Sequence, residues 1–138
     1  MSVFDDLRNG QSYDIRNEDY QREVHGEIDR CDHICWEISQ TDPADKDKLV
    51  ALENELMGGQ MKDGTFFTPP MNIDCASNVH VGKNVYANHH LTMMSLGTIT
   101  IEDGVMMGLV LACLRSTTNR KIFGWSRPAR SHLRKMLG

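Results

Sequence analysis

The sequence has no long apolar run, few cysteines and few prolines, and these scarcities exclude several classes of protein. Nowhere in its 138 residues do apolar side chains continue for the roughly 20 positions that a transmembrane helix needs. The first residues, with Asp5 and Asp6 among them, lack the basic and then apolar pattern of a secretion signal. Four unevenly spaced cysteines do not suit a disulfide-rich secreted scaffold. We therefore expect a cytoplasmic protein with free thiols and no membrane partner.

Acidic residues are also missing from residues 109–138, which carry seven Lys and Arg side chains. Residues 1–60, in contrast, carry 15 acidic and 6 basic side chains. A basic segment of this kind is typical of an arm that binds nucleic acid or another protein, or of sequence that was never selected to fold. Only Phe123 and Trp125 could stack on bases there, so nucleic acid is an unlikely partner. A binding module without catalysis remains the alternative function.

Two amphipathic helices are predicted in residues 1–60. The first extends from Asn17 to about Gln40, where apolar residues recur at steps of three and four. The second begins near Asp42-Pro43, a capping residue followed by a proline suited to the first turn, and ends at Gly58-Gly59. Residues 1–60 are therefore expected to form a helical unit.

After Pro69-Pro70 the apolar pattern acquires a period of six. This period matches neither a helix nor a flat strand, and it indicates hexapeptide repeats, in which three short faces make one turn of a parallel β-helix of about 18 residues. Small or turn-forming residues near the block ends fit its corners. The aliphatic residues that begin the blocks, expected inside the coil, are Ile73, Val79, Val85, Leu91, Ile99 and Val105.

The pattern resembles the maltose and galactoside O-acetyltransferases, a family of hexapeptide-repeat acyltransferases. The resemblance covers residues 1–108 and rests on Tyr13-Asp14, on Leu56-Met57-Gly58, on the Pro-Pro-Met-Asn-Ile-Asp segment at 69–74, and above all on residues 77–88. It implies an α+β fold, with an N-terminal helical unit followed by a left-handed parallel β-helix. It further implies homotrimers with each active site between neighbouring subunits, and a histidine base that activates a sugar hydroxyl to attack acetyl-CoA.

The resemblance also implies acceptor-site residues. The positions that match the family's sugar-binding residues are Asp14, Asp74 and Asn88, with acetyl-CoA as co-substrate and no metal. From the residues alone, each has a structural alternative: Asp14 could cap a turn, Asp74 could lie at a solvated edge, and Asn88 could form a corner. Where the family usually carries an acidic residue, this chain has Met94-Ser95-Leu96.

Residues 109–138 depart from the family, which continues with a Thr-Val-Asn-His-type segment that carries the catalytic histidine. No catalytic residue is therefore assigned, and we expect residues 1–138 alone to be inactive or impaired. Read one base earlier, codons that can encode residues 114–120 also encode Phe-Thr-Val-Asn-His-Glu-Pro, which suggests a truncation by frameshift near Gly108. The expected organisation is a helical unit at 1–60, a partial β-helix at 61–111, and a basic, non-native tail at 112–138.

Three other groups of residues stand out in the sequence. Cys31 and Cys35 with His33 between them suggest a metal site, but only two of the three share a helix face, so buried thiols are expected. His89-His90, beside Asn88, could supply a substitute base, with at most one of the two facing a cleft. Met93-Met94 and Met106-Met107 are expected to fill irregular space in the core.

Overall fold

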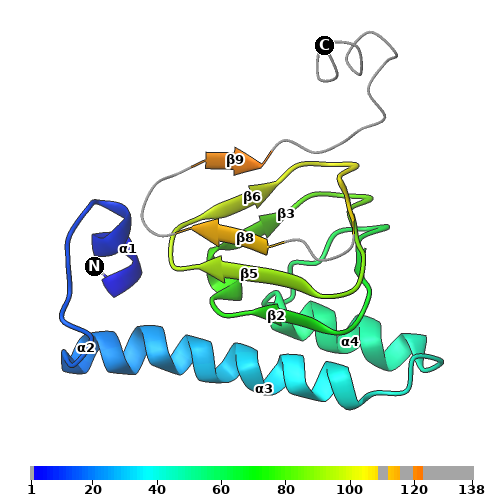
Figure 1. The fold of residues 1–138 in the computed structure, drawn as a ribbon, viewed down its shortest axis with the longest axis horizontal. Coiled ribbons are helices and arrows are strands. Elements are labelled where there is room, and N and C mark those ends of the chain that lie inside the picture. Colours follow the sequence, from blue (N-terminus) through cyan, green and yellow to red (C-terminus); the bar gives the residue numbers. More distant parts are fainter. Residues whose placement is uncertain (1, 109–111, 116–119, 123–138) are drawn as a thin grey trace, which may run out of the picture.

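The computed structural model describes residues 2–108 and two strands beyond them, at 112–115 and 120–122 (Figure 1). The chain begins with a short helix, α1 (Val3–Arg8), which the apolar periodicity does not predict. Its start is fixed by Ser2 and Asp5, whose side chains each bond to the other's backbone N–H. This reciprocal cap stabilises a helix of only six residues, because two otherwise unpaired donors are satisfied.

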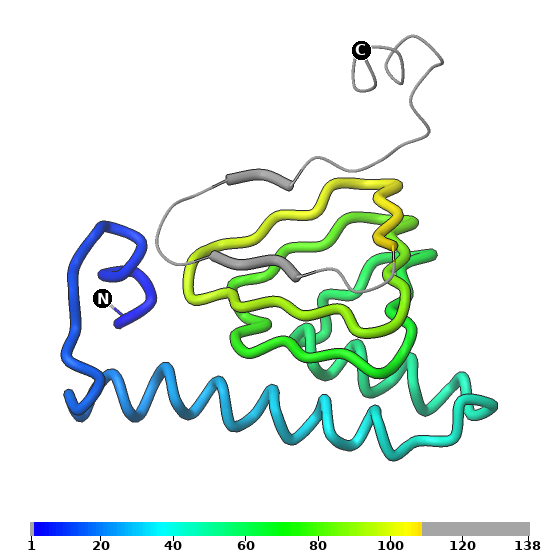
Figure 2. The backbone as a smooth tube through the Cα atoms, viewed as in Figure 1, coloured from blue at the N-terminus to red at the C-terminus, as the bar shows by residue number. Residues whose placement is uncertain are grey.

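A long helical segment follows and extends beneath the rest of the molecule (Figure 2). It comprises α2 (Glu18–Tyr20), one wide turn η1 (Gln21–His25) and α3 (Gly26–Gln40), and it agrees with the helix predicted from Asn17. The Asn17 side chain caps it by accepting from the N–H groups of Asp19 and Tyr20. Its buried stripe is Cys31, Ile34, Cys35 and Ile38.

The second helix, α4 (Lys46–Leu56), begins later than the sequence predicts. Asp42 does not cap it, because its side chain accepts from the N–H of Ala44 and its carbonyl accepts from the N–H of Asp45, which makes a separate turn. Asp45 then caps α4 by accepting from the N–H of Lys48. Pro43 therefore lies in the connecting turn rather than in the first turn of the helix.

The remaining strands wind into a parallel coil with three faces. Each strand pairs in parallel with the strand three places later in the chain. This pairing gives the sheets β1-β4-β7, β2-β5-β8 and β3-β6-β9. The strands are β1 (Phe66–Phe67), β2 (Met71–Ile73), β3 (Val79–Val81), β4 (Tyr86–Ala87), β5 (Leu91–Ser95), β6 (Ile99–Ile101), β7 (Met106–Met107), β8 (Ala112–Arg115) and β9 (Arg120–Ile122). A short 3₁₀ turn, η2 (Ala76–Asn78), joins β2 to β3.

One turn of this coil takes 20 residues rather than the expected 18: Met71 pairs with Leu91 and Val79 pairs with Ile99. Two of the three faces keep the period of six residues. The third face, which begins with β2 in the first turn and with β5 in the second, is two residues longer in both turns. In the first turn η2 accommodates the extra residues. Gly97 and Thr98, which interrupt the six-residue period between Leu91 and Ile99, are therefore the second copy of a feature that also occurs in the first turn.

The six aliphatic residues at the beginnings of the blocks are all buried inside the coil, as predicted. The methionine prediction is only half correct. Met93 and Met107 are buried, but Met94 and Met106 are exposed, because successive side chains of a strand face opposite sides. One corner of the coil stacks residues with positive φ at intervals of 20, namely Gly64, Asn84 and Gly104.

Regular pairing continues past residue 111, where we expected the coil to end. Strand β8 pairs with β5 and β9 pairs with β6, both in parallel, although residues 112–138 lack the six-residue period. Pairing of this kind needs only backbone N–H and C=O groups, which the free edges of β5 and β6 present whatever the side chains. Apart from these two strands, residues 112–138 lie outside the described part of the chain. The interpretation that they are translated out of frame therefore stays a prediction. None of the described helices is long and apolar enough to cross a membrane.

Candidate functional site

Asp14 lies in the exposed loop between α1 and α2, and Arg16 occupies both of its carboxylate oxygens. Oδ1 accepts from the Arg16 backbone N–H at 2.8 Å and from its Nε at 3.1 Å, and Oδ2 accepts from Nη2 at 3.0 Å. These bonds from the Arg16 side chain and backbone lower the pKa of Asp14, which keeps it ionised. The turn role considered for Asp14 is thus present in the structure.

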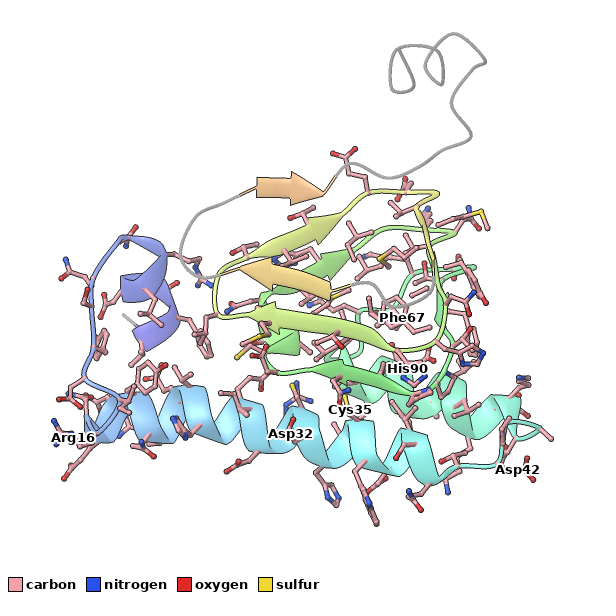
Figure 3. All side chains as sticks on the ribbon, viewed as in Figure 1. Arg16, Asp32, Cys35, Asp42, Phe67 and His90 are labelled. Atoms are coloured by element: carbon pink, nitrogen blue, oxygen red, sulfur yellow. The ribbon has the colours of Figure 1, made fainter. Side chains whose placement is uncertain are left out.

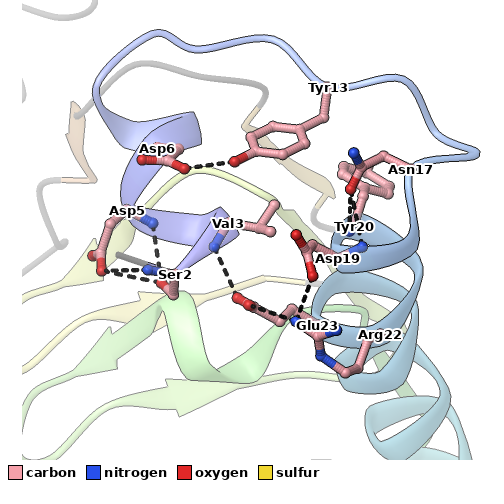
Figure 4. A network of polar contacts seen from close by, with 10 residues as sticks. All are labelled: Ser2, Val3, Asp5, Asp6, Tyr13, Asn17, Asp19, Tyr20, Arg22 and Glu23. Carbon is pink, nitrogen blue, oxygen red and sulfur yellow. Dashed lines mark hydrogen bonds and ion pairs between the residues drawn. The ribbon is translucent and has the colours of Figure 1, made fainter.

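A network of polar contacts holds this loop in place (Figure 4). Tyr13 donates its hydroxyl to Asp6 and packs against Tyr20, with ring centroids 6.3 Å apart. Glu23 accepts from the backbone N–H of Val3 at 2.8 Å, which ties the first helix to the long one. The Asp14 loop is therefore fixed at both ends, and its carboxylate occupies a defined position.

Asp74 follows β2 and clamps two turns of the coil together. Its Oδ1 accepts from the backbone N–H of Ser95 at 2.8 Å and from the Ser95 hydroxyl at 3.3 Å. Ser95 is completely buried and also donates to the carbonyl of Cys75 at 2.8 Å. Asp74 itself is half-buried, and among the described residues its Oδ2 has no hydrogen-bond partner. One oxygen is structural, and the other is free to bind a ligand.

Asn88 forms the corner between β4 and β5. Its backbone N–H donates to the carbonyl of Met107 at 3.0 Å, and its side-chain Oδ1 accepts from the N–H of His89 at 2.8 Å. The corner role considered for Asn88 is therefore present as well. Its side-chain amide nitrogen bonds to none of the described residues, so it remains available as a donor.

The three candidates do not come together within one chain. Asp74 bonds to Ser95 at the end of β5, whereas Asn88 precedes the start of β5, so the length of a strand, roughly 15 Å, separates them. Asp14 lies on the same side of the coil as Asp74. Its neighbour Tyr13 packs on Tyr20, whose pKa is raised by burial first and then by the nearby Cys75 and Asp74. In Figure 3, Arg16, two residues from Asp14, lies at the left edge of the molecule, and His90, two residues from Asn88, lies to the right of its centre.

His89 and His90 both lie on the surface beside Asn88. His89 Nδ1 bonds to the carbonyl of Pro69, and because a carbonyl can only accept, Nδ1 is the donor of this bond. The backbone N–H of His90 donates to Pro70 at 2.8 Å, and the residue has a φ of 65°. Of the two rings, that of His89 is oriented by a hydrogen bond to the backbone.

Cys31, Cys35 and His33 do not converge on one point. Both thiols are buried against the coil, whereas His33 faces outward, where its Nε2 lies 2.8 Å from Glu37. Burial raises the pKa of Cys31 to about 12, which keeps it a protonated thiol. These cysteines contribute to the core between α3 and β2 rather than to a metal site with His33.

Glu53 is a polar residue that the sequence reasoning missed. It lies on the buried face of α4 with only 1% of its surface exposed. The signal was present, because Leu49, Leu52 and Leu56 define a helical stripe on which position 53 also falls. Its Oε2 accepts from the N–H of Phe67 at 3.1 Å, whereas Oε1 has no hydrogen-bond partner among the described residues. Burial raises the pKa of Glu53 to about 7.

Comparisons with known proteins agree with this fold. The chain is 30% identical over 74 residues to galactoside O-acetyltransferase of Escherichia coli, and the match covers 54% of this chain and 36% of the relative. It is 29% identical over 107 residues to a putative acetyltransferase of Saccharomyces cerevisiae, covering 78% and 53%. A putative acetyltransferase of Staphylococcus aureus is 36% identical over 81 residues, covering 59% and 40%. The chain thus spans about a third to a half of the length of these relatives. No protein-family model matches it.

Solved structures give the same assignment of fold. Galactoside acetyltransferase in complex with coenzyme A superposes with a TM-score of 0.63 at 23% identity, over 99% of this chain and 61% of that one. A maltose O-acetyltransferase from Clostridium difficile gives 0.59 at 20% identity, over 99% and 65%. The chain is therefore similar in sequence to acetyltransferases, galactoside O-acetyltransferase among them. It shares its fold with a galactoside acetyltransferase and a maltose O-acetyltransferase.

Proposed function

We propose that the chain acts in the transfer of an acetyl group from acetyl-CoA to a hydroxyl of a sugar. The observation that carries this proposal is the sequence relationship to galactoside O-acetyltransferase, found in a chain that also folds as a three-faced coil on a helical unit. A structural relative binds coenzyme A, which supports acetyl-CoA as the donor.

In this proposal, Asp14, Asp74 and Asn88 contact the acceptor sugar. Carboxylate oxygens accept hydrogen bonds from hydroxyls, and the free amide of Asn88 donates one. Their separation within one chain supports a site shared between subunits, with Asp14 and Asp74 from one copy and Asn88 from the next. A homotrimer with a left-handed coil, as the family resemblance implies, belongs to the same proposal.

The base that removes the hydroxyl proton is not assigned to a described residue. Residues 109–138 contain no segment that resembles the histidine segment of the family. We therefore propose that residues 1–138 on their own bind the acceptor but transfer acetyl groups slowly, since loss of a general base costs about 10²–10⁴-fold.

The test measures binding and transfer separately. Saturation-transfer NMR reports binding of galactosides and maltose, and mass spectrometry detects acetylated sugar after incubation with acetyl-CoA. We expect sugar binding that Asp14→Ala and Asn88→Ala abolish, with transfer near background. A chain that binds no sugar, or that acetylates amines in preference to sugar hydroxyls, would contradict the proposal.

A further inference from the structure

The described part of the chain contains a cavity that none of the sugar-site candidates lines. Its volume is about 690 Å³, and it lies between α4 and the segment that leads into β1. Val50, Met61 and Phe66 contribute an apolar wall. Asp47, Lys62 and Asp63 contribute charged groups. A cavity of this size and mixed lining suits a small organic molecule.

Glu53 also lines this cavity and carries an unsatisfied oxygen. Oε2 accepts from the N–H of Phe67, but Oε1 is covered by protein and, within the part of the chain that the structure describes, meets no donor. A buried acceptor without a donor is costly, and an ionised one is more costly still. A ligand that donates a hydrogen bond to Oε1 would remove this cost.

The other charges around the cavity favour a cation. Among the described residues, the side chains of Asp47, Asp63 and Lys62 form no hydrogen bond or ion pair. The Lys46 ammonium lies 5.8 Å from the ring centroid of Phe66, so this ring already carries a cation. With Glu53, three carboxyl groups thus stand against the two ammonium groups of Lys46 and Lys62, and a ligand's ammonium is drawn to the carboxyl groups rather than to the ring.

We propose that the cavity between α4 and β1 binds a small organic amine, an ammonium group on an apolar body, with Glu53 Oε1 as the acceptor of the ammonium. The apolar body packs against Val50 and Phe66. Because Oε1 is covered, a side chain of the wall moves aside on binding, and the unbranched, half-buried Met61 is suited to do so. This site is separate from the proposed transfer of acetyl groups.

The experiment compares benzylamine with its neutral analogue, benzyl alcohol, by isothermal titration calorimetry on the full chain at neutral pH. We expect benzylamine to bind and the alcohol to bind at least about tenfold more weakly, since it lacks the charge. Glu53→Gln should weaken benzylamine binding roughly 10- to 100-fold, the usual range for one charge-assisted hydrogen bond. Glu55→Gln, an exposed carboxylate on the same helix, should leave it unchanged.

A second measurement on the unaltered chain keeps the proposal testable if Glu53→Gln does not fold. Glu53 has a pKa of about 7 and is therefore about half protonated at neutral pH, and a bound ammonium favours its ionised form. Benzylamine binding should release a proton, seen as a heat that changes with the ionisation enthalpy of the buffer. No benzylamine binding, equal binding of amine and alcohol, full binding by Glu53→Gln, or no proton release would overturn the proposal.

Discussion

The two ends of the coil are closed in different ways. At the first turn, side chains from the helices accept from backbone N–H groups that have no strand beyond them: Glu53 from Phe67 at 3.1 Å, Glu27 from Ser77 at 3.0 Å, and the Cys31 sulfur from Ala76 at 3.4 Å. At the other end, β8 and β9 cover two faces, and within the described residues β7 pairs only with β4. Helical side chains cap one end, and backbone pairing continues the other.

This difference explains why the helical unit and the coil form one body. An open sheet edge is a template for unwanted pairing, and natural proteins cover it. Here α3 and α4 do so with both apolar and polar side chains, and the core runs without interruption from Ile38 through Phe67 into the coil. The helical unit is the floor of the coil, which places the Asp14 loop beside the end of β2.

The largest effect is expected from removing the aromatic side chain at the capped end. Phe67 is fully buried between α4 and the coil, so Phe67→Ala should destabilise the protein by roughly 3–5 kcal/mol. Met106→Ala, on the exposed side of the same sheet, should change stability by less than about 0.5 kcal/mol. Urea unfolding followed by circular dichroism measures both, and similar losses would show that the cap does not dominate stability.

A smaller effect, with opposite sign, is expected at Glu53. Burial raises its pKa from 4.5 to about 7, so the folded state binds the proton more tightly than the unfolded state. Its favourable contribution is complete below about pH 4.5 and is lost as pH rises through 7, at a cost of roughly 1–3 kcal/mol. Glu53→Gln should therefore raise stability at pH 8, and the gain should vanish near pH 5.

Denaturation curves at several pH values check this prediction. Glu55→Gln is the matched control and should show no such pH-dependent gain, because its side chain is exposed. A gain from Glu53→Gln that is the same at pH 5 and pH 8 would contradict ionisation as its cause.

Glu27 provides the reverse case at the same end of the coil. Burial alone would raise its pKa, but bonds from Arg30 and from the N–H of Ser77 outweigh burial and lower it. Its contribution is therefore present above about pH 4.5 and is lost as pH falls through the lowered pKa. Glu27→Gln should cost roughly 1–2 kcal/mol at pH 7 and less at pH 3, measured by the same unfolding curves. A cost that grew on acidification would contradict this assignment.

The sequence predicts the inside of the coil better than its turns. Residues such as Val79 and Ile99 are recognisable because burial on one side imposes an aliphatic residue at a fixed interval. The length of 20 residues cannot be recognised from the sequence of the first turn of the coil. Its two extra residues are accommodated by η2, and no apolar residue marks their position. The turn also begins at Met71, which precedes Ile73, the first residue of the six-residue period. Helix α1 escapes prediction because its cap, rather than periodicity, defines it.

The residues of the candidate site stay a prediction, and their arrangement in the structure could not be predicted from the sequence. Resemblance points to Asp14, Asp74 and Asn88, and each has a side-chain atom without a described partner or a position on the surface. Their contacts with Arg16, Ser95 and His89 depend on loop conformations that no periodicity encodes. The burial of Glu53 could have been predicted from the sequence, because its carboxyl group falls on the same helix face as the buried leucines.

The smallest effect on stability is expected from a substitution of Asp14. This residue therefore distinguishes most clearly between a role in stability and a role in sugar binding. Its ion pair with Arg16 is exposed, and water screens pairs of this kind so that they contribute little to stability. Asp14→Asn should therefore leave the unfolding curve almost unchanged, whereas sugar binding should weaken roughly 10-fold or more if the carboxylate holds an acceptor hydroxyl. Arg16→Gln is the control, because it breaks the same ion pair but keeps the carboxylate. If Arg16→Gln weakened sugar binding as much as Asp14→Asn, the pair as a whole, rather than the carboxylate, would be the sugar contact.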